Sequence, residues 1–175
     1  MSAGRARWGF HQLADPYVRR LVTASSVGEG NLVVDVGAGN GAITRRLLET
    51  GARVQAIELH PGRAEALRSR FGTRVRVIEA DIECWRWPTR PYFVVANPPF
   101  GMLATLLRRI TAPGSRLVQA HLVVPAHFAA RCMHGASYLR SPYSVGVVCR
   151  LPAHAFTPAA TTTTAVICVG RGGRS

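Results

Sequence analysis

Two kinds of charged residue are missing: the sequence contains no lysine, and no aspartate or glutamate follows Glu83. All 22 basic residues are therefore arginines, and the formal net charge is +13. Between residues 21 and 83 eight acids balance eight arginines, whereas residues 84–175 carry ten arginines and no acid. Because arginine binds phosphate bidentately and stacks on bases, this asymmetry indicates a polyanionic partner on one side of the molecule.

Cysteine is scarce, and long apolar runs are absent. The four cysteines form no CxxC pair and lie at Cys84, Cys132, Cys149 and Cys168. His127, Cys132 and His134 lie close together in the sequence, but their spacing matches no common ligand pattern. No segment approaches the roughly 18 apolar residues of a membrane span, and residues 1–10 are not followed by the apolar stretch of a signal peptide. We expect a cytoplasmic protein without metal, disulfide or membrane contact, and as a working expectation a monomer.

Short apolar runs alternate with helical patterns along most of the chain. The strands are expected at 31–36, 53–57, 75–79, 91–96, 117–124, 144–151 and 163–169. The helices are expected at 17–24, with Asp15 as its N-cap, and at 42–50, with Gly51 as its C-cap, 61–71, 102–110 and 126–133. This alternation is typical of a doubly wound α/β sheet, and the last two strands should form an antiparallel hairpin. The predicted organisation is a basic arm over residues 1–14 and a single domain over 15–175.

Glycines and acids follow the first three predicted strands. Gly37, Gly39 and Gly41 lie between the first strand and its helix, where the backbone can turn sharply and approach a ligand. Glu58 ends the second strand, where a carboxylate can accept both ribose hydroxyls of an adenosine. Asp81 follows the third strand and can accept the adenine amino group. The pattern fits an adenosine-containing cofactor, but it does not separate S-adenosylmethionine from NAD.

The sequence Asn97-Pro98-Pro99-Phe100 follows the apolar strand and decides between these cofactors. The exocyclic amine of adenine is a poor nucleophile because its lone pair is delocalised into the ring. Its two N–H groups can be bound by the Asn97 side-chain oxygen and by the Pro98 carbonyl, which the prolines hold in place. Phe100 can stack on a base that has left its own stack. These residues predict methyl transfer from S-adenosylmethionine to an adenine amine.

With these motifs the chain resembles the Erm family of 23S rRNA adenine-N6 methyltransferases, relatives of the 16S rRNA dimethyladenosine transferases. Residues 9–13 resemble the family's Gln-Asn-Phe-Leu motif, so the resemblance implies cofactor contacts by His11 and Leu13, although Phe10 and His11 replace the usual Gln and Asn. It also implies cofactor contacts by the side chains and turns named above, Gly37, Gly39, Glu58, Asp81 and Asn97. Phe156-Thr-Pro158 resembles a late segment of the family whose Phe helps to hold the flipped adenine, so Phe156 joins Asn97, Pro98 and Phe100 as a catalytic candidate.

The resemblance implies a Rossmann-like class I methyltransferase fold, with a mostly parallel seven-stranded sheet and one antiparallel late strand. It also implies resistance to macrolide, lincosamide and streptogramin B antibiotics through methylation of naked or partly assembled 23S rRNA. Pro99 stands where dimethylating members have Ile or Leu, which favours mainly monomethylation. The chain ends where the family's C-terminal helical domain would begin. RNA binding would then depend on arginines of the arm and of the second half: Arg5, Arg7, Arg108, Arg109, Arg116, Arg131 and Arg140.

Three other functions remain open from the sequence. The Asn-Pro-Pro-Phe motif also fits adenine-N6 DNA methyltransferases and glutamine-N5 methyltransferases, although Phe156 and the absence of a sequence-reading domain argue against both. A non-catalytic RNA-binding assembly factor on the same fold would fit the unusual residues at positions 10 and 11.

Overall fold

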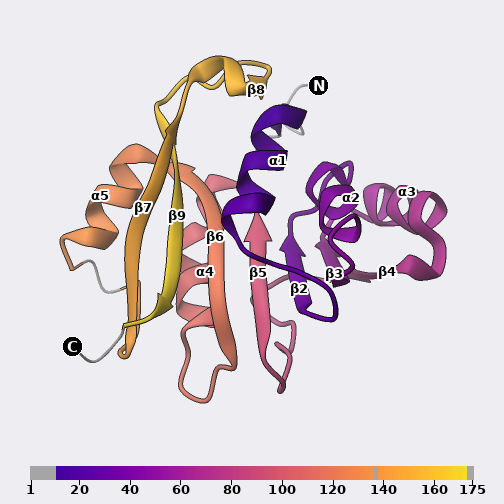
Figure 1. The fold of residues 1–175 in the computed structure, drawn as a ribbon, viewed down its shortest axis with the longest axis horizontal. Coiled ribbons are helices and arrows are strands. Elements are labelled where there is room, and N and C mark those ends of the chain that lie inside the picture. Colours follow the sequence, from indigo (N-terminus) through magenta and orange to yellow (C-terminus); the bar gives the residue numbers. More distant parts are fainter. Residues whose placement is uncertain (1–10, 136–137, 173–175) are drawn as a thin grey trace, which may run out of the picture.

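The computed structural model describes residues 11–135 and 138–172, and its centre is a seven-stranded sheet (Figure 1). The strands are β2 (Leu32–Val36), β3 (Arg53–Glu58), β4 (Val75–Glu79), β5 (Tyr92–Ala96), β6 (Leu117–Pro125), β7 (Tyr143–Leu151) and β9 (Thr164–Arg171). They lie in the order β4-β3-β2-β5-β6-β9-β7. β2 to β6 are parallel, whereas β9 is antiparallel to both β6 and β7. The predicted Rossmann-like methyltransferase topology, including the antiparallel late strand, is confirmed.

Helices cover both faces of this sheet. α1 (Asp15–Ala24), α2 (Ala42–Leu48) and α3 (Pro61–Phe71) pack on one face, and α4 (Leu103–Ile110) and α5 (Ala126–Met133) pack on the other. Short 3-10 turns, η2 (Gly72–Arg74), η3 (Phe100–Met102) and η4 (Ala153–Ala155), connect some of these elements. Among the residues described, no helix is both long enough and apolar enough to cross a membrane.

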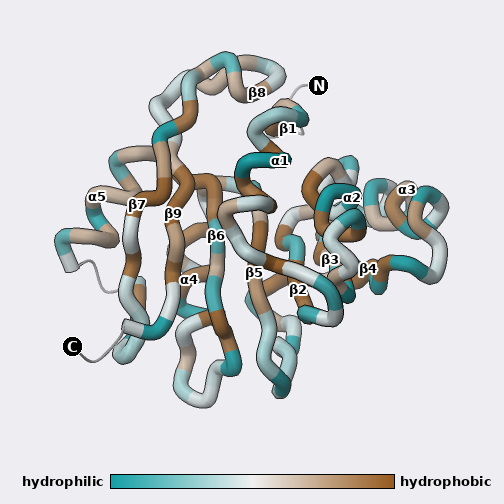
Figure 2. Tube along the Cα trace, viewed as in Figure 1, coloured by the Kyte–Doolittle hydropathy of each residue, from teal (hydrophilic) through white to brown (hydrophobic). Residues whose placement is uncertain are grey.

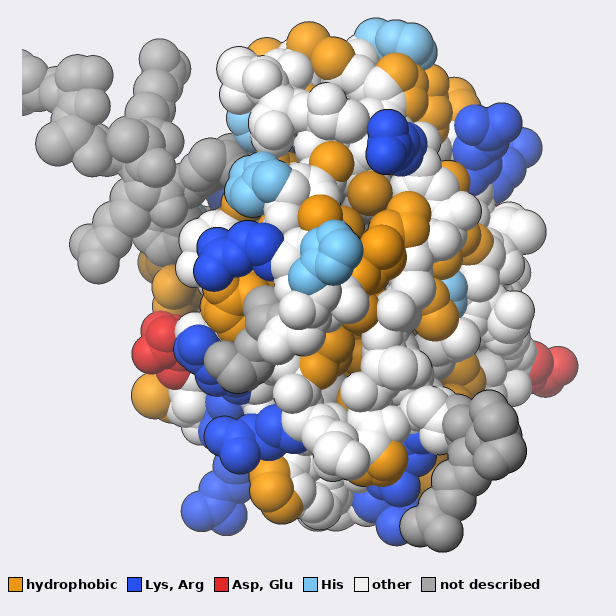
Figure 3. All heavy atoms as spheres, turned by 90° about the vertical axis from the view of Figure 1, so that its left-hand side faces the viewer, with side chains coloured by type: hydrophobic (Ala, Val, Ile, Leu, Met, Phe, Trp, Pro, Cys, Tyr) orange, Lys and Arg blue, Asp and Glu red, His pale blue; other side chains and the backbone are white. Residues whose placement is uncertain are grey.

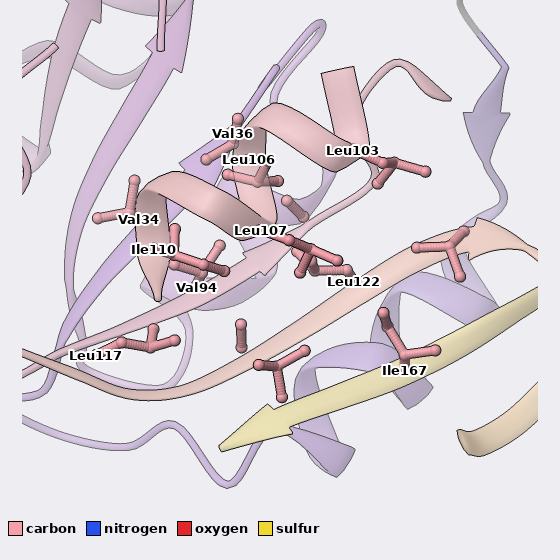
Figure 4. Packing of buried hydrophobic residues seen from close by; sticks show 14 of the residues in the cluster. Val34, Val36, Val94, Leu103, Leu106, Leu107, Ile110, Leu117, Leu122 and Ile167 are labelled. Atoms are coloured by element: carbon pink, nitrogen blue, oxygen red, sulfur yellow. The ribbon is translucent and has the colours of Figure 1, made fainter. Parts of the chain in front are cut away.

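The core beneath α4 shows how a short helix is held on the sheet. Leu103, Leu106, Leu107 and Ile110 follow the i, i+3, i+4, i+7 spacing of one helix face, and all four are fully buried. Figure 4 shows them above the sheet residues Val94, Leu122 and Ile167. Burial of a Leu or Ile side chain contributes about 1.5–3 kcal/mol, so this face fixes the helix that follows the Asn97 loop.

A second core lies between the other face of the sheet and α1, α2 and α3. The strands that separate the two cores are buried on both sides, and Figure 2 shows hydrophobic residues along β5, β6 and β9. Continuous apolar strands of this kind are expected for a sheet that is covered on both faces.

The N-terminal segment differs from the prediction. Residues Gln12–Leu13 form strand β1, which pairs antiparallel with β8 (Phe156–Thr157), so the expected irregular arm includes a strand. A backbone hydrogen bond from Ala14 N–H to the Ala155 carbonyl (2.8 Å) extends the pairing. Residues 12–14 are thereby attached to the loop of the β7–β9 hairpin. The division into an arm of residues 1–14 and one domain of residues 15–175 stays a prediction.

Two helix ends also differ from the prediction. Ala14, not Asp15, is the N-cap of α1, and no side chain caps this helix. The Asp15 carboxylate instead binds the guanidinium groups of Arg45 (2.6 Å) and Arg46 on α2. The hydrogen bond from Arg46 holds the pKa of Asp15 below its ordinary value. At the other end of α2, Glu49 is the C-cap, and Gly51 lies in the turn beyond it.

Candidate active site

A cavity of about 520 Å³ opens at the carboxyl ends of β2, β3 and β5. Its walls come from the glycine turn after β2, the end of β3, the loop after β4, the Asn97 loop after β5 and the N-terminal segment 11–13. In parallel sheets, ligands bind in this position because neighbouring connections leave the sheet in opposite directions. The strand ends and the N-terminal segment therefore bring together most of the cofactor-binding and catalytic candidates of the sequence, but none of the candidate RNA-binding arginines that the structure describes.

The glycine turn and the Asn97 loop are in direct contact. Gly37 adopts φ +69°, and its N–H donates to the Ile57 carbonyl at 2.8 Å. A Cβ at this position would lie 3.1 Å from Pro99 Cδ and 3.7 Å from Pro98 Cα. Both the backbone conformation and the close approach of Pro99 therefore require glycine at position 37.

Glu58 is held in the cavity wall by backbone donors. The Gly39 N–H donates to Glu58 Oε2 and the His60 N–H to Glu58 Oε1, both at 2.9 Å. The residue is only 4% exposed, yet it lines the cavity. Each carboxylate oxygen retains a lone pair for a hydroxyl group. Gly39, which the sequence placed among the cofactor contacts, does not itself line the cavity but positions this carboxylate.

Asp81 also lines the cavity and is exposed. Its Oδ1 accepts the N–H of Glu83 at 2.9 Å, which orders the loop after β4. The neighbouring Ile82 also lines the cavity and is buried. A carboxylate beside an apolar side chain suits an adenine ring, whose faces are apolar and whose amino group is a donor.

The Asn97 side chain has a defined orientation. Its Nδ2 donates to the backbone carbonyl of His11 at 2.8 Å, so its Oδ1 remains free to accept hydrogen bonds. The His11 ring lies 3.0 Å from the Pro158 carbonyl through Nδ1, which ties the same segment to the hairpin loop. His11 and Leu13 both line the cavity beside Asn97, as do Pro98 and the half-buried Phe100.

Asp35 is a cavity residue that the sequence analysis did not single out. It is 1% exposed; its Oδ2 accepts the Thr44 hydroxyl at 2.6 Å, and its Oδ1 has no partner. Burial raises the pKa of Asp35 to about 7, partly opposed by the Thr44 hydrogen bonds. An acid inside the apolar run Leu32–Val36 was the available signal, because such a position is rarely polar without a role.

Several predicted site residues lie away from the cavity. Phe156 is 3% exposed, packs in the core that contains α1, and is absent from the cavity wall. Arg116 directly precedes β6 at the end of the sheet opposite the cavity, and Arg108 and Arg109 lie in the last turn of α4, which runs towards that end. Arg109 also donates to the Trp85 carbonyl at 2.6 Å, and its Nε is buried.

The remaining predicted RNA contacts are distributed as follows. Arg131 lies in the last turn of α5, and the backbone N–H of Arg140 donates to Thr111 Oγ1 at 3.2 Å just beyond α4. Arg5 and Arg7 lie outside the described residues. Within the described part of the chain, no group of three or more His, Cys, Asp and Glu side chains is arranged to hold a metal ion.

The residues of the cavity fit an adenosine-containing methyl donor. Two carboxylates at successive strand ends can take ribose hydroxyls and an amino group, and Ile57, Ile82 and Leu13 supply apolar walls. The unpartnered Asp35 Oδ1 adds a buried acceptor in the same cavity. Together with the sheet topology, these features define a class I methyltransferase domain.

Sequence and structure comparisons place the chain within this class. The family model described as "Ribosomal RNA adenine dimethylase" matches residues 1–167, so the chain belongs to that family. The "Ribosomal RNA small subunit methyltransferase A" of Synechococcus sp. is 30% identical over 185 residues, covering 93% of this chain and 66% of that protein. The mycinamicin-resistance protein MyrB of Micromonospora griseorubida is 35% identical over 108 residues, covering 61% of this chain and 35% of that protein.

Among solved structures, the 23S rRNA methyltransferase ErmE superposes with a TM-score of 0.81 at 19% identity, over 92% of this chain and 70% of that chain. At this identity the likeness supports the fold alone. The predicted cofactor, S-adenosylmethionine, is confirmed at the level of the family. The chain spans about two thirds of the length of the curated relatives that it matches.

Proposed function

We propose that this chain transfers a methyl group from S-adenosylmethionine to N6 of an adenine in 23S rRNA, mainly once, and thereby confers macrolide, lincosamide and streptogramin B resistance. The observation that carries the proposal is the orientation of Asn97. Its amide nitrogen is bound by the His11 carbonyl, so an acceptor oxygen remains free beside the cavity. An acceptor oxygen in that position favours a substrate amine, which can donate its N–H groups to the protein.

The residues of the Asn97 loop share the work on the adenine. Asn97 Oδ1 and the Pro98 carbonyl accept the two N–H groups of N6, which directs the nitrogen lone pair towards the cofactor side of the cavity. Bound S-adenosylmethionine supplies an electrophilic methyl group. No side chain with a tuned pKa is needed as a base, because the amine becomes acidic once it is methylated and loses its proton to water.

Phe100 supports the base by stacking in this proposal, since it lines the cavity and is half-buried. Pro99, which packs against Gly37, leaves a rigid wall beside the amine and favours one methylation over two. The contribution expected of Phe156 stays a prediction, because its side chain lies in the core under α1.

The choice of ribosomal subunit has two candidates. A drug-resistance protein among the relatives, together with the resemblance of the sequence motifs to the Erm family, favours 23S rRNA as the substrate. Relatives such as that of Caulobacter vibrioides, 33% identical over 93% of this chain, are small-subunit rRNA methyltransferases by name and favour 16S rRNA as the second candidate. In either case the substrate would be naked or partly assembled rRNA, and the location would be the cytoplasm.

Mapping of methylated nucleotides tests this choice directly. The chain is expressed in a host that lacks the modification, and both rRNAs are examined by mass spectrometry and primer extension. We expect N6-methyladenine in 23S rRNA with the wild-type chain and none with Asn97→Ala. Asn31→Ala is the control, because Asn31 lies in the turn before β2 and its side chain bonds only to the Gly28 N–H in the described structure.

Methylation confined to 16S rRNA would select the second candidate, and unmodified adenines in both rRNAs would refute the proposal. A transfer assay with labelled methyl groups then compares rRNA, duplex DNA and a release factor, which separates the DNA and glutamine methyltransferase alternatives. A chain that binds RNA but no S-adenosylmethionine in calorimetry would instead be a non-catalytic RNA-binding protein.

A further inference from the structure

Two arginines converge on one tyrosine on the face of the molecule that carries α5 and β7. The guanidinium carbon of Arg108, in the last turn of α4, lies 5.5 Å from the centre of the Tyr138 ring. The guanidinium carbon of Arg131, in the last turn of α5, lies 5.4 Å from the same centre. We call Arg108, Arg131 and Tyr138 the arginine–tyrosine cluster.

The tyrosine itself is held in place by the core. Its ring stacks on Phe128 with centroids 5.2 Å apart and an angle of 9° between the planes. Phe128 is a buried residue of α5 and belongs to the same hydrophobic core as the apolar face of α4. Tyr138 therefore provides a fixed surface that orders two flexible side chains from two different helices before any partner arrives.

Both guanidinium groups keep their hydrogen-bond donors available. The side chains are exposed, and no described residue forms an ion pair or hydrogen bond with either guanidinium. All seven ion pairs of the described chain lie between residues 15 and 79. Figure 3 shows arginine and histidine side chains across the face that carries α5 and β7, with acidic side chains only at its margins.

Helix termini explain only part of this arrangement. Arginine in the last turn of a helix is favoured by the helix dipole, which accounts for one cation on each helix. It does not account for two like charges held at one ring, because they repel each other and no carboxylate of the described residues pairs with either of them. An anion between or beside the two groups removes that repulsion and uses the free donors.

We propose that the arginine–tyrosine cluster binds backbone phosphates of the substrate RNA outside the cofactor cavity. α4 connects the two places, since η3 at its start lines the cavity and Arg108 lies near its end. RNA whose target base occupies the cavity would follow α4 and be held at the cluster. This inference rests on the proposed function, because it takes RNA as the partner.

The test measures binding of the full chain to a short fluorescein-labelled single-stranded oligoribonucleotide at several salt concentrations. In Arg108→Gln/Arg131→Gln we expect the slope of log K against log salt to become shallower by about 1.4, since each phosphate contact on a single strand contributes about 0.7. At 0.1 M salt the loss of these two phosphate contacts weakens RNA binding roughly 10- to 30-fold. Affinity for S-adenosylmethionine should not change.

The matched control is Arg53→Gln/Arg76→Gln, which removes the same charge from exposed positions on β3 and β4, at the other end of the sheet. We expect a much smaller change in slope for this variant. Tyr138→Leu should weaken RNA binding because the guanidinium groups lose the aromatic ring that they share. Tyr138→Phe keeps the ring and should bind RNA as the wild-type chain does.

Three outcomes would overturn the inference. Equal slopes for the two double variants would show that only net charge matters. An unchanged slope in Arg108→Gln/Arg131→Gln, while the wild-type chain methylates rRNA, would show that the cluster does not bind RNA and would not contradict the proposed function. A wild-type chain that binds no RNA at any salt concentration would contradict both this inference and the proposed function.

Discussion

The two halves of the chain use arginine differently. In residues 11–83 the arginines of α2 bind Asp15 and Glu49, and Arg68 of α3 binds Glu65 and Glu79. In residues 84–172 four arginines contact backbone carbonyls or aromatic rings and no acid: Arg108, Arg109, Arg131 and Arg171. All seven ion pairs of the described chain lie in the first half, whereas the second half leaves several arginines available to a partner.

The acids are also confined to the first half. Glu58 and Asp81 line the cavity, where the proposed cofactor has hydroxyl and amino donors that need acceptors. In the proposed reaction Asn97 acts in the second half with a neutral amide, which does not repel a polyanion. The cavity lies where the halves meet, at the pairing of β2 with β5 and at the contact of Gly37 with Pro99.

The largest expected effect compares two aromatic residues of the second half. Phe156→Ala should lower the free energy of unfolding by about 3–5 kcal/mol, because it leaves a cavity in a closed core. Urea denaturation followed by circular dichroism measures the change. Phe100→Ala is the paired variant, and we expect a much smaller loss of stability with strongly reduced methyl transfer. A stable Phe156→Ala protein with no activity would instead favour the adenine contact expected from the sequence.

The next effect is a pH dependence located in the first half. The folded pKa of Asp35 is raised to about 7 from an ordinary value near 3.8, so the folded state binds this proton more tightly than the unfolded state. The resulting stability is complete below about pH 4 and is lost as the pH rises to about 7, which amounts to roughly 3 kcal/mol between pH 5 and pH 8.

Urea unfolding of wild type and Asp35→Asn at pH 5, 6, 7 and 8 isolates this contribution. The Asn variant lacks the titrating group, so its free energy of unfolding should decline between pH 5 and pH 8 by roughly 3 kcal/mol less than that of the wild type. Parallel curves for the two proteins would show that the Asp35 carboxyl is not the group responsible.

A smaller effect separates cofactor binding from catalysis. Glu58→Gln places an amide against the Gly39 and His60 N–H groups and removes one acceptor. We expect S-adenosylmethionine affinity in calorimetry to fall about ten- to hundredfold, or roughly 1.4–2.8 kcal/mol. The rate at saturating cofactor should change little. Asn97→Ala should instead lower the rate at saturating cofactor and leave the affinity for S-adenosylmethionine nearly unchanged. An equal loss of affinity in both variants would show that cofactor binding is not confined to the first half.

The smallest effect concerns surface charge. Arg68→Gln removes exposed pairs with Glu65 and Glu79, so stability should fall by at most about 1 kcal/mol at low salt and by less at high salt. Arg108→Gln breaks no ion pair in the described structure and should leave stability unchanged or slightly increased. Thermal melts at two salt concentrations measure both. A larger loss for Arg108→Gln would assign that residue to the fold instead of a partner.

Short-range patterns predicted much of the fold and the cofactor side of the site. The seven strands, the helix 61–71 and the antiparallel late strand follow from apolar periodicity and from the missing helix between the last two strands. Gly37, Glu58, Asp81 and Asn97 were found because each stands directly at a strand end, a position that can be located along the chain.

The errors share one cause, which is contact between residues far apart in the sequence. Aspartate is a common N-cap residue, but the Asp15 carboxylate is bound instead by Arg45 and Arg46, which lie 30 and 31 residues further along the chain. Residues 12–13 form a strand because β8 lies beside them. For Asp35 a local signal exists, an acid within an apolar strand, but its burial and its unpartnered oxygen depend on how α2 and the glycine turn close over it.

The sequence by itself determined the class of fold, the order of chemically important strand ends and the separation of charge along the chain, because strand period, glycine turns and ion content are local properties. Only the tertiary structure decided which way the Asn97 amide faces, since the carbonyl that orients it belongs to His11. The same is true of Phe156, buried on strand β8, and of the two arginines that meet at Tyr138. These features depend on packing between distant segments, where burial and direction are set by neighbours that no local pattern reveals.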